Sequence, residues 1–334
     1  METVACELCG SDRSHVILRQ GDLTHSVSRD LFTVVRCEDC RICYLNPRPT
    51  AAEIGRYYPG EYFAPLPPRS RTDAERALKR FSGRIKRWIM EDFYGYPTSK
   101  KMGLGRWLRK LVLWPEKVRR LLRGRDILPW IGAGRVLDVG CGPGGNLATL
   151  QEQGWEVYGV EMSPAAVAQA RVRVGDRIYA GTLETAPFAD GFFDVVLFSH
   201  SLEHLFSPVD ALTRARRLLR PEGLLVIAVP NAGSLEAKLF GPCWFPWQLP
   251  RHLYHFEQET LKRLLKRAGF RVVRFRTGVG TLFFMASLDQ VWEQRFNRQP
   301  PMRKAIEKLL ARPLCLAAGH LGHGTEMTVY AVKS

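Results

Sequence analysis

An acidic residue followed by closely spaced glycines is a pattern that can bind a ligand. Asp138 stands among apolar residues in Arg135-Val-Leu-Asp-Val139, and Gly140, Gly142 and Gly144 follow it. This pattern predicts a buried strand, a tight turn and the start of a helix. Because glycine has no side chain, a ligand can approach the backbone N–H groups at the helix start. The stretch therefore predicts a cofactor site.

Two kinds of cofactor are compatible with the glycine spacing alone. Gly140, Gly142 and Gly145 also fit the dinucleotide fingerprint G-x-G-x-x-G. A carboxylate before the first glycine repels a pyrophosphate and attracts a cationic amino group. Asp138 therefore favours S-adenosylmethionine over a nicotinamide dinucleotide. A glycine turn that only packs a strand against a helix is the structural alternative.

Alternating strands and helices position this site. The predicted strands are residues 135–139, 156–160, 177–180, 193–198 and 224–229. Parallel strands joined by helices bind their ligand at the carboxyl edge of the sheet, and the fold class is therefore α/β. Glu161 ends the second strand, where an acid can accept hydrogen bonds from both ribose hydroxyls. Ser163 and Pro164 predict the cap and first turn of the next helix.

Two pairs of cysteines form a second candidate site. Cys6-x-x-Cys9 and Cys37-x-x-Cys40 have the spacing of a four-thiolate Zn²⁺ site, which leaves no open position for catalysis and is structural. Cys43 is expected to be a bystander. The chain starts without a basic and then apolar leader, so no signal peptide is expected and the thiols should be reduced. Reduced structural or redox cysteines are the alternative.

The positive charge is concentrated in one part of the chain. The net charge is +16, and residues 69–125 hold eighteen Lys and Arg against five Asp and Glu. Apolar residues at helical spacing predict basic amphipathic helices there, with Pro115 in the first turn of a new helix. Such helices could bind an anionic membrane or nucleic acid, or form a solvated cover. No apolar run is long enough for a transmembrane helix.

These observations predict three regions. They are a zinc-ribbon-like module at residues 1–50, a linker with basic helices at 51–130, and a cofactor-binding domain at 131–334. Pro65, Pro67 and Pro68 mark the linker. Two insertions in the last region, residues 230–258 and 278–325, are expected to hold the acceptor site and additional helices.

The first insertion is rich in aromatic residues and basic side chains. Its aromatic residues are Phe240, Trp244, Phe245, Trp247, Tyr254 and Phe256, which could form an acceptor wall or a core patch. The candidate general bases are His252, which we prefer, His204 and His255, because a neutral imidazole can accept a proton near pH 7. His204 could instead cap its loop. Arg251 could bind a phosphate or carboxylate of the acceptor.

The ordered motifs together resemble the class I S-adenosylmethionine-dependent methyltransferases. The motifs are Val136-Leu-Asp-Val-Gly-Cys-Gly-Pro-Gly144, Glu161, Gly181-Thr-Leu-Glu-Thr-Ala-Pro-Phe188, Leu202-Glu-His-Leu205 and Leu219-Arg-Pro-Glu-Gly-Leu-Leu225. The cysteine module, Asn46-Pro-Arg-Pro49 and Pro250-Arg-His-Leu-Tyr-His-Phe256 resemble methyltransferases of sugar, polysaccharide and natural-product pathways.

This resemblance implies a Rossmann-like seven-stranded sheet whose last strand, residues 326–332, is antiparallel. It also implies a set of cofactor contacts. Asp138, Gly140, Gly142 and Gly144 would hold the methionine part, Glu161 the ribose, Met162, Thr182 and Leu183 the adenine, and Ser199 would lie near the sulfonium. Two residues depart from the family pattern: Thr182 stands where an acid is common, and Arg41 stands where glycine usually follows the fourth cysteine.

The sequence therefore predicts a methyltransferase acting on a small molecule or glycan precursor, including a lipid-linked one. It would be cytoplasmic, with the basic helices at the inner face of a membrane. One alternative is an rRNA or tRNA methyltransferase. However, Ser199-His-Ser-Leu-Glu-His204 lacks the Asn-Pro-Pro-aromatic motif of many base-amine methylases. The other alternative is a non-catalytic cofactor-binding scaffold.

Overall fold

The computed structural model describes residues 1–59, 73–97, 104–122 and 127–334. The chain divides into two units, Met1–Phe63 with Gly134–Ser334, and Ala64–Ala133. The predicted linker prolines lie outside the described residues. Each unit is considered separately below.

A mixed sheet of seven strands forms the centre of the larger unit. Its strands are β4 (Arg135–Val139), β5 (Glu156–Glu161), β6 (Ile178–Ala180), β7 (Phe193–Ser199), β8 (Leu219–Pro230), β10 (Phe270–Thr277) and β11 (Glu326–Lys333). Their order is β10-β11-β8-β7-β4-β5-β6. Strands β8, β7, β4, β5 and β6, which are neighbours in this order, run parallel. Strand β11 pairs antiparallel with both β8 and β10. The predicted α/β fold with an antiparallel last strand is confirmed.

Helices between the strands complete this core. They are α3 (Gly145–Glu152), α4 (Pro164–Val174), α5 (Pro208–Leu218) and α7 (Gln258–Arg267), with α3 packed beside α4 and α5 beside α7. The predicted start of α4 is confirmed, because the Ser163 side chain accepts a hydrogen bond from the Ala166 N–H and Pro164 occupies the first turn. The apolar face of α5 is buried at Ala211, Leu212, Ala215 and Leu218.

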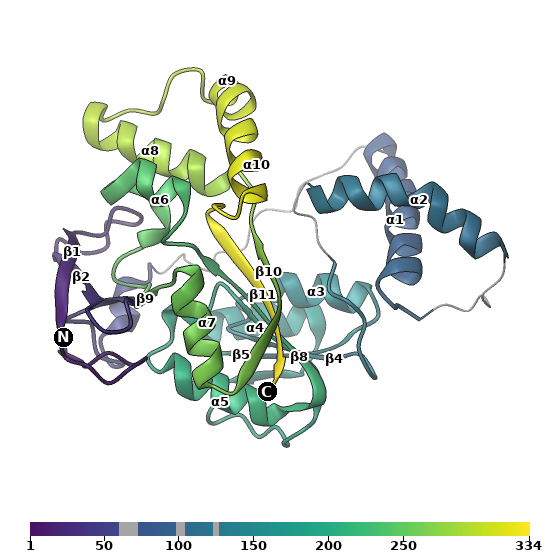
Figure 1. Cartoon of the computed structure of the whole chain (residues 1–334), viewed down its shortest axis with the longest axis horizontal. Coiled ribbons are helices and arrows are strands. Elements are labelled where there is room, and N and C mark those ends of the chain that lie inside the picture. The colour runs from purple at the N-terminus through teal and green to yellow at the C-terminus, as the bar shows by residue number, and fades with distance from the viewer. Residues whose placement is uncertain (60–72, 98–103, 123–126) are drawn as a thin grey trace. The chain divides into compact units, whose positions relative to one another are not determined.

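A smaller antiparallel sheet joins the N-terminal residues to the later insertion. Its strands are β1 (Ser14–Gln20), β2 (Phe32–Cys37), β3 (Cys43–Leu45) and β9 (Tyr254–His255), in that order. Figure 1 shows β9 beside the N-terminal strands, although it follows them by about two hundred residues. Cys43 pairs with His255, and Tyr44 pairs with Tyr254. The module and the main sheet therefore share one hydrophobic core.

The remaining elements of this unit are short helices. They are η1 (Ile54–Tyr57), η2 (Leu202–His204), α6 (Leu235–Phe240), η3 (Gly241–Cys243), η4 (Phe245–Trp247), α8 (Leu282–Phe296), α9 (Arg303–Ile306), η5 (Glu307–Ala311) and α10 (Arg312–His320). Figure 1 shows α6, α8 and α10 grouped on one side of the sheet. Helix α8 packs against η4 and α6, so the two insertions contact each other.

The smaller unit is a pair of helices, α1 (Asp73–Phe93) and α2 (Leu104–Leu122). The Arg109 guanidinium donates two hydrogen bonds to Asp92, at 2.7 and 2.8 Å, and the rings of Phe93 and Trp114 pack together. The expectation that Pro115 begins a new helix is wrong, because α2 continues through it. Proline removes one backbone hydrogen bond, and contacts of Trp114 and Lys117, on either side of Pro115, with Phe93 of α1 help hold the helix there.

The length and the exposed apolar side chains of these helices decide how they could contact a membrane. No helix among the described residues is long and apolar enough to cross a membrane. Among the side chains of α2 that the structure describes, residues 107–119, five large apolar ones are nevertheless more than half exposed: Trp107, Leu108, Leu111, Val112 and Trp114.

Candidate active site

The glycine loop between β4 and α3 requires its glycines for two physical reasons. Gly140, Gly142 and Gly144 have φ values of +72°, +52° and +78°, in the left-handed region that disfavours other residues. A Cβ at Gly140 would lie 2.7 Å from the Ser201 Cβ, and one at Gly144 would lie 3.1 Å from Ala170. The loop is therefore packed tightly against the segment that follows β7.

The Asp138 carboxylate is buried, and only one of its two oxygens has a hydrogen-bond partner among the described residues. Its side chain is buried, and Oδ2 accepts a hydrogen bond from the Asn146 amide at 3.1 Å. Oδ1 is buried without a hydrogen-bond partner. Burial raises the pKa of Asp138 to about 7, although the Asn146 amide lowers it. A cationic amino group would supply the missing partner, which is the fit expected for the methionine part of S-adenosylmethionine.

Glu161 closes the other side of the loop. Its carboxylate accepts backbone hydrogen bonds from Gly142 at 2.9 Å and Ser163 at 2.8 Å. Each carboxylate oxygen has a second lone pair, so this orientation leaves acceptors for ribose hydroxyls. Met162, beside it, is 68% exposed and can cover a planar ring. The residues expected to contact the ribose and one side of the adenine, Glu161 and Met162, thus lie at the end of β5.

The last cofactor candidates follow β6 and end β7. Leu183 is buried, and the Thr182 N–H donates to the Thr185 hydroxyl at 3.3 Å. The Thr182 hydroxyl also lies 3.3 Å from that oxygen, so it is engaged locally. Ser199 is exposed at the end of β7. Because β4 to β7 run parallel, these residues and the glycine loop share the carboxyl edge of the sheet.

The four predicted cysteine ligands converge. Sγ of Cys6 lies 3.3 Å from that of Cys40, Sγ of Cys9 lies 3.5 Å from that of Cys37, and all four lie within 4.8 Å of one another. A tetrahedral zinc site with Zn–S bonds of about 2.3 Å separates its sulfurs by about 3.8 Å. The thiols therefore fit a zinc ion closely. Cys43 is not part of the cluster.

The turn after the fourth cysteine keeps its geometry without glycine. The N–H of Gly10 donates to the Cys6 carbonyl at 2.7 Å, and the N–H of Arg41 donates to the Cys37 carbonyl at 3.1 Å. Gly10 has φ +79° and Arg41 has φ +70°, so the two turns match. Arg41 adopts the left-handed conformation at a cost of about 1–2 kcal/mol.

Two of the candidate bases lie together. Nδ1 of His204 is 2.9 Å from the Arg251 carbonyl oxygen and 3.2 Å from the Tyr58 hydroxyl, and Nδ1 of His252 is 2.8 Å from the Pro246 carbonyl oxygen. Their ring centroids are 4.6 Å apart. Burial lowers the pKa of both imidazoles, and that of His252 falls well below its usual value, so both are neutral at pH 7.

His255 is placed differently from the other two candidates. Its ring packs on Trp247 at 4.7 Å and lies 6.4 Å from the ring of His252. Burial lowers its pKa to about 3, and its Nε2 has no hydrogen-bond partner. The structure therefore brings His204 and His252 together and leaves His255 further along the strand β9.

Sequence reasoning missed two residues of this region, His200 and Glu203. Nδ1 of His200 lies 3.5 Å from Oε1 of Glu203, and its Nε2 lies 3.3 Å from Oε2 of Glu326. Burial opposes a charge on His200, but the two carboxylates outweigh it and raise its pKa to about 10. The sequence signals were their place after β7 and the motif Leu202-Glu-His-Leu205, which contains Glu203; Glu326 comes from β11, more than a hundred residues later.

The predicted role of Arg251 in binding the acceptor is wrong. Its side chain is fully buried and donates to both carboxylate oxygens of Asp22, at 2.8 and 2.9 Å. It also donates to the Tyr57 carbonyl at 3.0 Å. A buried guanidinium needs such a partner, and the N-terminal module supplies it. Arg251 therefore joins the module to the insertion and is not available to an acceptor.

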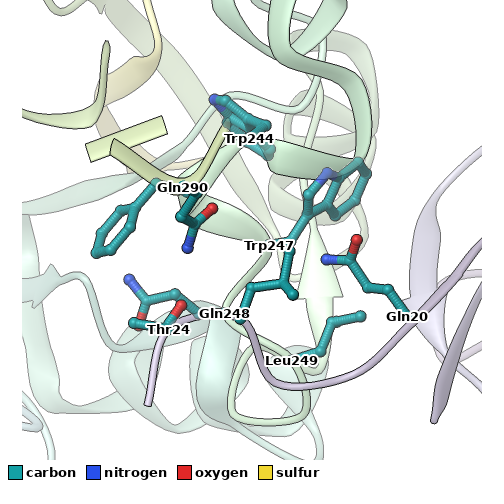
Figure 2. Close-up of a pocket in the computed structure, with 9 residues that line it drawn as sticks. Gln20, Thr24, Trp244, Trp247, Gln248, Leu249 and Gln290 are labelled. Carbon is teal, nitrogen blue, oxygen red and sulfur yellow. The ribbon is translucent and has the colours of Figure 1, made fainter. Parts of the chain in front are cut away.

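The aromatic insertion serves partly as core and partly as a surface. Trp244, Tyr254 and Phe256 are buried, which corresponds to the core alternative. Phe245 and Trp247 line a narrow hollow that is too small to enclose a water molecule, together with Gln20, Leu23, Thr24, Trp244, Gln248, Leu249 and Gln290. Figure 2 shows the labelled side chains around this hollow. It therefore combines amide groups with indole rings.

The fold and the glycine loop are those of a cofactor-binding α/β domain, and comparison with known proteins identifies the family. A family model described as "Methyltransferase domain" matches residues 102–274, more than half of the chain. The chain therefore belongs to this methyltransferase family. The expected resemblance is confirmed.

The chain spans about half the length of the curated relatives it matches. The chain is 33% identical over 135 residues to a demethylmenaquinone methyltransferase of Beutenbergia cavernae, covering 40% of this chain and 51% of the relative. It is 30% identical over 153 residues to a ubiquinone biosynthesis O-methyltransferase of Cereibacter sphaeroides, covering 42% and 62%. A solved S-adenosylmethionine-dependent methyltransferase from Thermotoga maritima has 21% identity and a TM-score of 0.45, over 78% of this chain and 99% of that one.

Proposed function

We propose that this methyltransferase transfers a methyl group to a small molecule or glycan precursor, including a lipid-linked one. The matched parts of the quinone-biosynthesis relatives support a small acceptor. A zinc ion held by Cys6, Cys9, Cys37 and Cys40 would be structural.

One observation carries the proposal: the segment after β7 contacts the cofactor loop. Ser201 lies so close to Gly140 that a Cβ there would be 2.7 Å away. Glu203 and His204 follow in η2, and His252 packs against His204. The segment that contacts the loop thus leads, three residues after Ser201, to a pair of neutral imidazoles, at the edge where parallel sheets bind ligands.

The residues of this chain would bind and align the reactants. Asp138 and Glu161 would fix the cofactor, and η2 would close one side of the site. S-adenosylmethionine held there would supply an electrophilic methyl group for in-line transfer to the acceptor. Because alignment and exclusion of water supply most of the acceleration, the chain needs few reacting side chains.

His252 is the preferred group for removing the acceptor proton. We assign its proton to Nδ1, which faces the Pro246 carbonyl, and this leaves a lone pair on Nε2. His204 has the same arrangement toward the Arg251 carbonyl. His255 is the third candidate, further from η2.

A methyl-transfer assay tests the proposal. Purified protein is incubated with methyl-labelled S-adenosylmethionine and three acceptor classes: demethylated quinone precursors, nucleotide sugars and bulk RNA. We expect label in one of the first two. His252→Ala should lower turnover about 100-fold and leave cofactor affinity nearly unchanged. Wild-type turnover in this variant would contradict the assignment of His252, and labelling of RNA alone would favour the nucleic-acid alternative.

The exposed face of α2 supports a location at a membrane. Trp107 and Leu111 belong to five large apolar residues exposed on a helix that lies in the most basic part of the chain. Tryptophans and basic side chains together suit the interface of an anionic bilayer. We propose that this helix holds the enzyme at the cytoplasmic face of a membrane, close to a lipid-linked acceptor.

A further inference from the structure

We propose that Glu203, His204 and His252 form a second metal site, which binds a divalent transition-metal ion such as Zn²⁺. The role given to the ion below rests on the proposed function, whereas its binding does not. The site is separate from the cysteine cluster and adjoins the cofactor loop.

The three side chains converge from two segments. Glu203 and His204 belong to η2, and His252 belongs to the turn before β9. One ligand atom from each lies within 4.8 Å of the other two. Metal–nitrogen and metal–oxygen bonds of about 2.0–2.2 Å bring ligand atoms about 3–4 Å apart, so a small rearrangement of side chains would complete the site.

Both imidazoles are held as metal ligands usually are. A ligand histidine donates its other ring N–H to a carbonyl or carboxylate, which fixes the tautomer. His204 and His252 each have Nδ1 within 2.9 Å of a backbone carbonyl oxygen. Both Nε2 lone pairs are thus left for another partner. Capping of the loop by His204 would need only one such imidazole, whereas here two lie side by side.

The Glu203 carboxylate is buried, with an ion partner on one side. The residue is 1% exposed, and neither carboxylate oxygen accepts a hydrogen bond from the residues that the structure describes. His200 lies 3.5 Å from Oε1 and divides its charge between Glu203 and Glu326. A cation between the Glu203 carboxylate and the two imidazoles would give Oε2 the partner that it lacks.

The donor set indicates the kind of ion. Two imidazole nitrogens and one carboxylate oxygen suit Zn²⁺, Fe²⁺ or Mn²⁺, whereas Mg²⁺ and Ca²⁺ prefer oxygen ligands alone. Three protein ligands leave open positions. An acceptor hydroxyl bound there would ionise more readily, with its proton passing to water, and would keep its oxygen lone pair for the methyl group. His252 would then act as a ligand to the ion rather than as a free base.

The position of the site agrees with this role. The Leu253 N–H donates to the Glu203 carbonyl at 2.8 Å, which ties the two segments together. Ser201, two residues before Glu203, touches the glycine loop at Gly140. An acceptor bound to the ion would therefore lie next to the cofactor loop.

Metal content of the full chain tests the proposal. Protein loaded with Zn²⁺ and dialysed should hold about two ions per chain, and Glu203→Gln and His252→Ala should each hold about one. His255→Ala removes a buried histidine of the same segment and should keep about two. Glu203→Gln preserves volume, so its melting temperature shows whether the fold survives.

Cobalt identifies which ion is lost. Loaded with Co²⁺, Glu203→Gln should retain the intense thiolate charge-transfer bands of the cysteine cluster and lose only weaker bands. About one zinc ion in the wild-type chain, or about two in Glu203→Gln, would overturn the proposal. Methyl transfer by a chain with one ion would overturn the site but leave the proposed function standing. Two ions in the wild-type chain and one in His252→Ala, with wild-type turnover in that variant, would leave the metal site standing and overturn the role of His252 in turnover.

Discussion

The Leu253 N–H donates to the Glu203 carbonyl at 2.8 Å, and the Leu253 carbonyl accepts from the Leu45 N–H at 2.9 Å. One residue thus connects the cysteine-rich module, the insertion and the segment after β7. Because β9 completes the module's sheet, the module positions His252 as well as stabilising itself. Loss of a cysteine ligand should therefore also change the position of His252.

Removal of the cysteine ligands should destabilise the larger unit. We expect Cys9→Ser to lose the structural metal and at least about 3 kcal/mol of unfolding free energy, because metal binding contributes directly to folding. Thermal unfolding with and without a chelator measures this change. Cys43→Ser is the matched control, since Cys43 is buried nearby but outside the cluster. Equal melting temperatures for Cys9→Ser and wild type would refute the structural role.

The Arg251–Asp22 pair should matter for stability rather than for acceptor binding. Arg251→Met leaves the Asp22 carboxylate buried without its ion partner and should cost about 3–5 kcal/mol. Arg251→Met combined with Asp22→Leu should cost less than Arg251→Met alone, because neither charge is then left unpaired. Denaturant unfolding of both variants measures this difference.

The same pair predicts a pH dependence. Burial opposes the charge of Asp22, but its hydrogen bonds and the Arg251 charge outweigh burial and lower its pKa below 3.8. The unfolded chain therefore binds more protons, and this stabilisation is present above about pH 4 and is lost as the pH falls through the lowered pKa. The loss should disappear in the double variant. A double variant less stable than Arg251→Met would contradict this account.

The exposed face of α2 should bind anionic membranes. Trp107→Ser with Leu111→Ser should lower the bound fraction on vesicles containing phosphatidylserine several-fold, because burial of both side chains is lost. Co-sedimentation at two salt concentrations measures binding, with neutral vesicles and RNA as comparisons. Undiminished binding by the variant, or binding to RNA alone, would rule out this surface as a membrane contact.

The sequence predicted the parts of the site that are local. Asp138, the glycines and Glu161 lie at strand ends that periodicity and turn residues mark, and the cysteine pairs have a recognisable spacing. The role of Arg251 was predicted wrongly because its partner, Asp22, is more than two hundred residues away. Glu203 was missed for the same reason, since its environment is made by His252 and by His200, whose second ion-pair partner comes from β11.

Asp138 should make the ligand-free protein less stable as the pH rises. Burial raises its pKa to about 7 in the folded chain, whereas the unfolded chain has the ordinary value of 3.8. Between these pH values the folded state therefore binds more protons than the unfolded state. Unfolding free energy should fall through this window, by at most about 1.4 kcal/mol per pH unit. Asp138→Asn should flatten that slope, as urea unfolding at several pH values would show.

The most direct test of the account is a calorimetric titration of wild type and Asp138→Asn with S-adenosylmethionine and NAD at pH 8, where Asp138 is ionised. We predict binding of S-adenosylmethionine to wild type in the micromolar range, about tenfold or more weaker binding to Asp138→Asn, and no binding of NAD. Binding of NAD without S-adenosylmethionine, or equal S-adenosylmethionine affinity in both proteins, would contradict the role of Asp138.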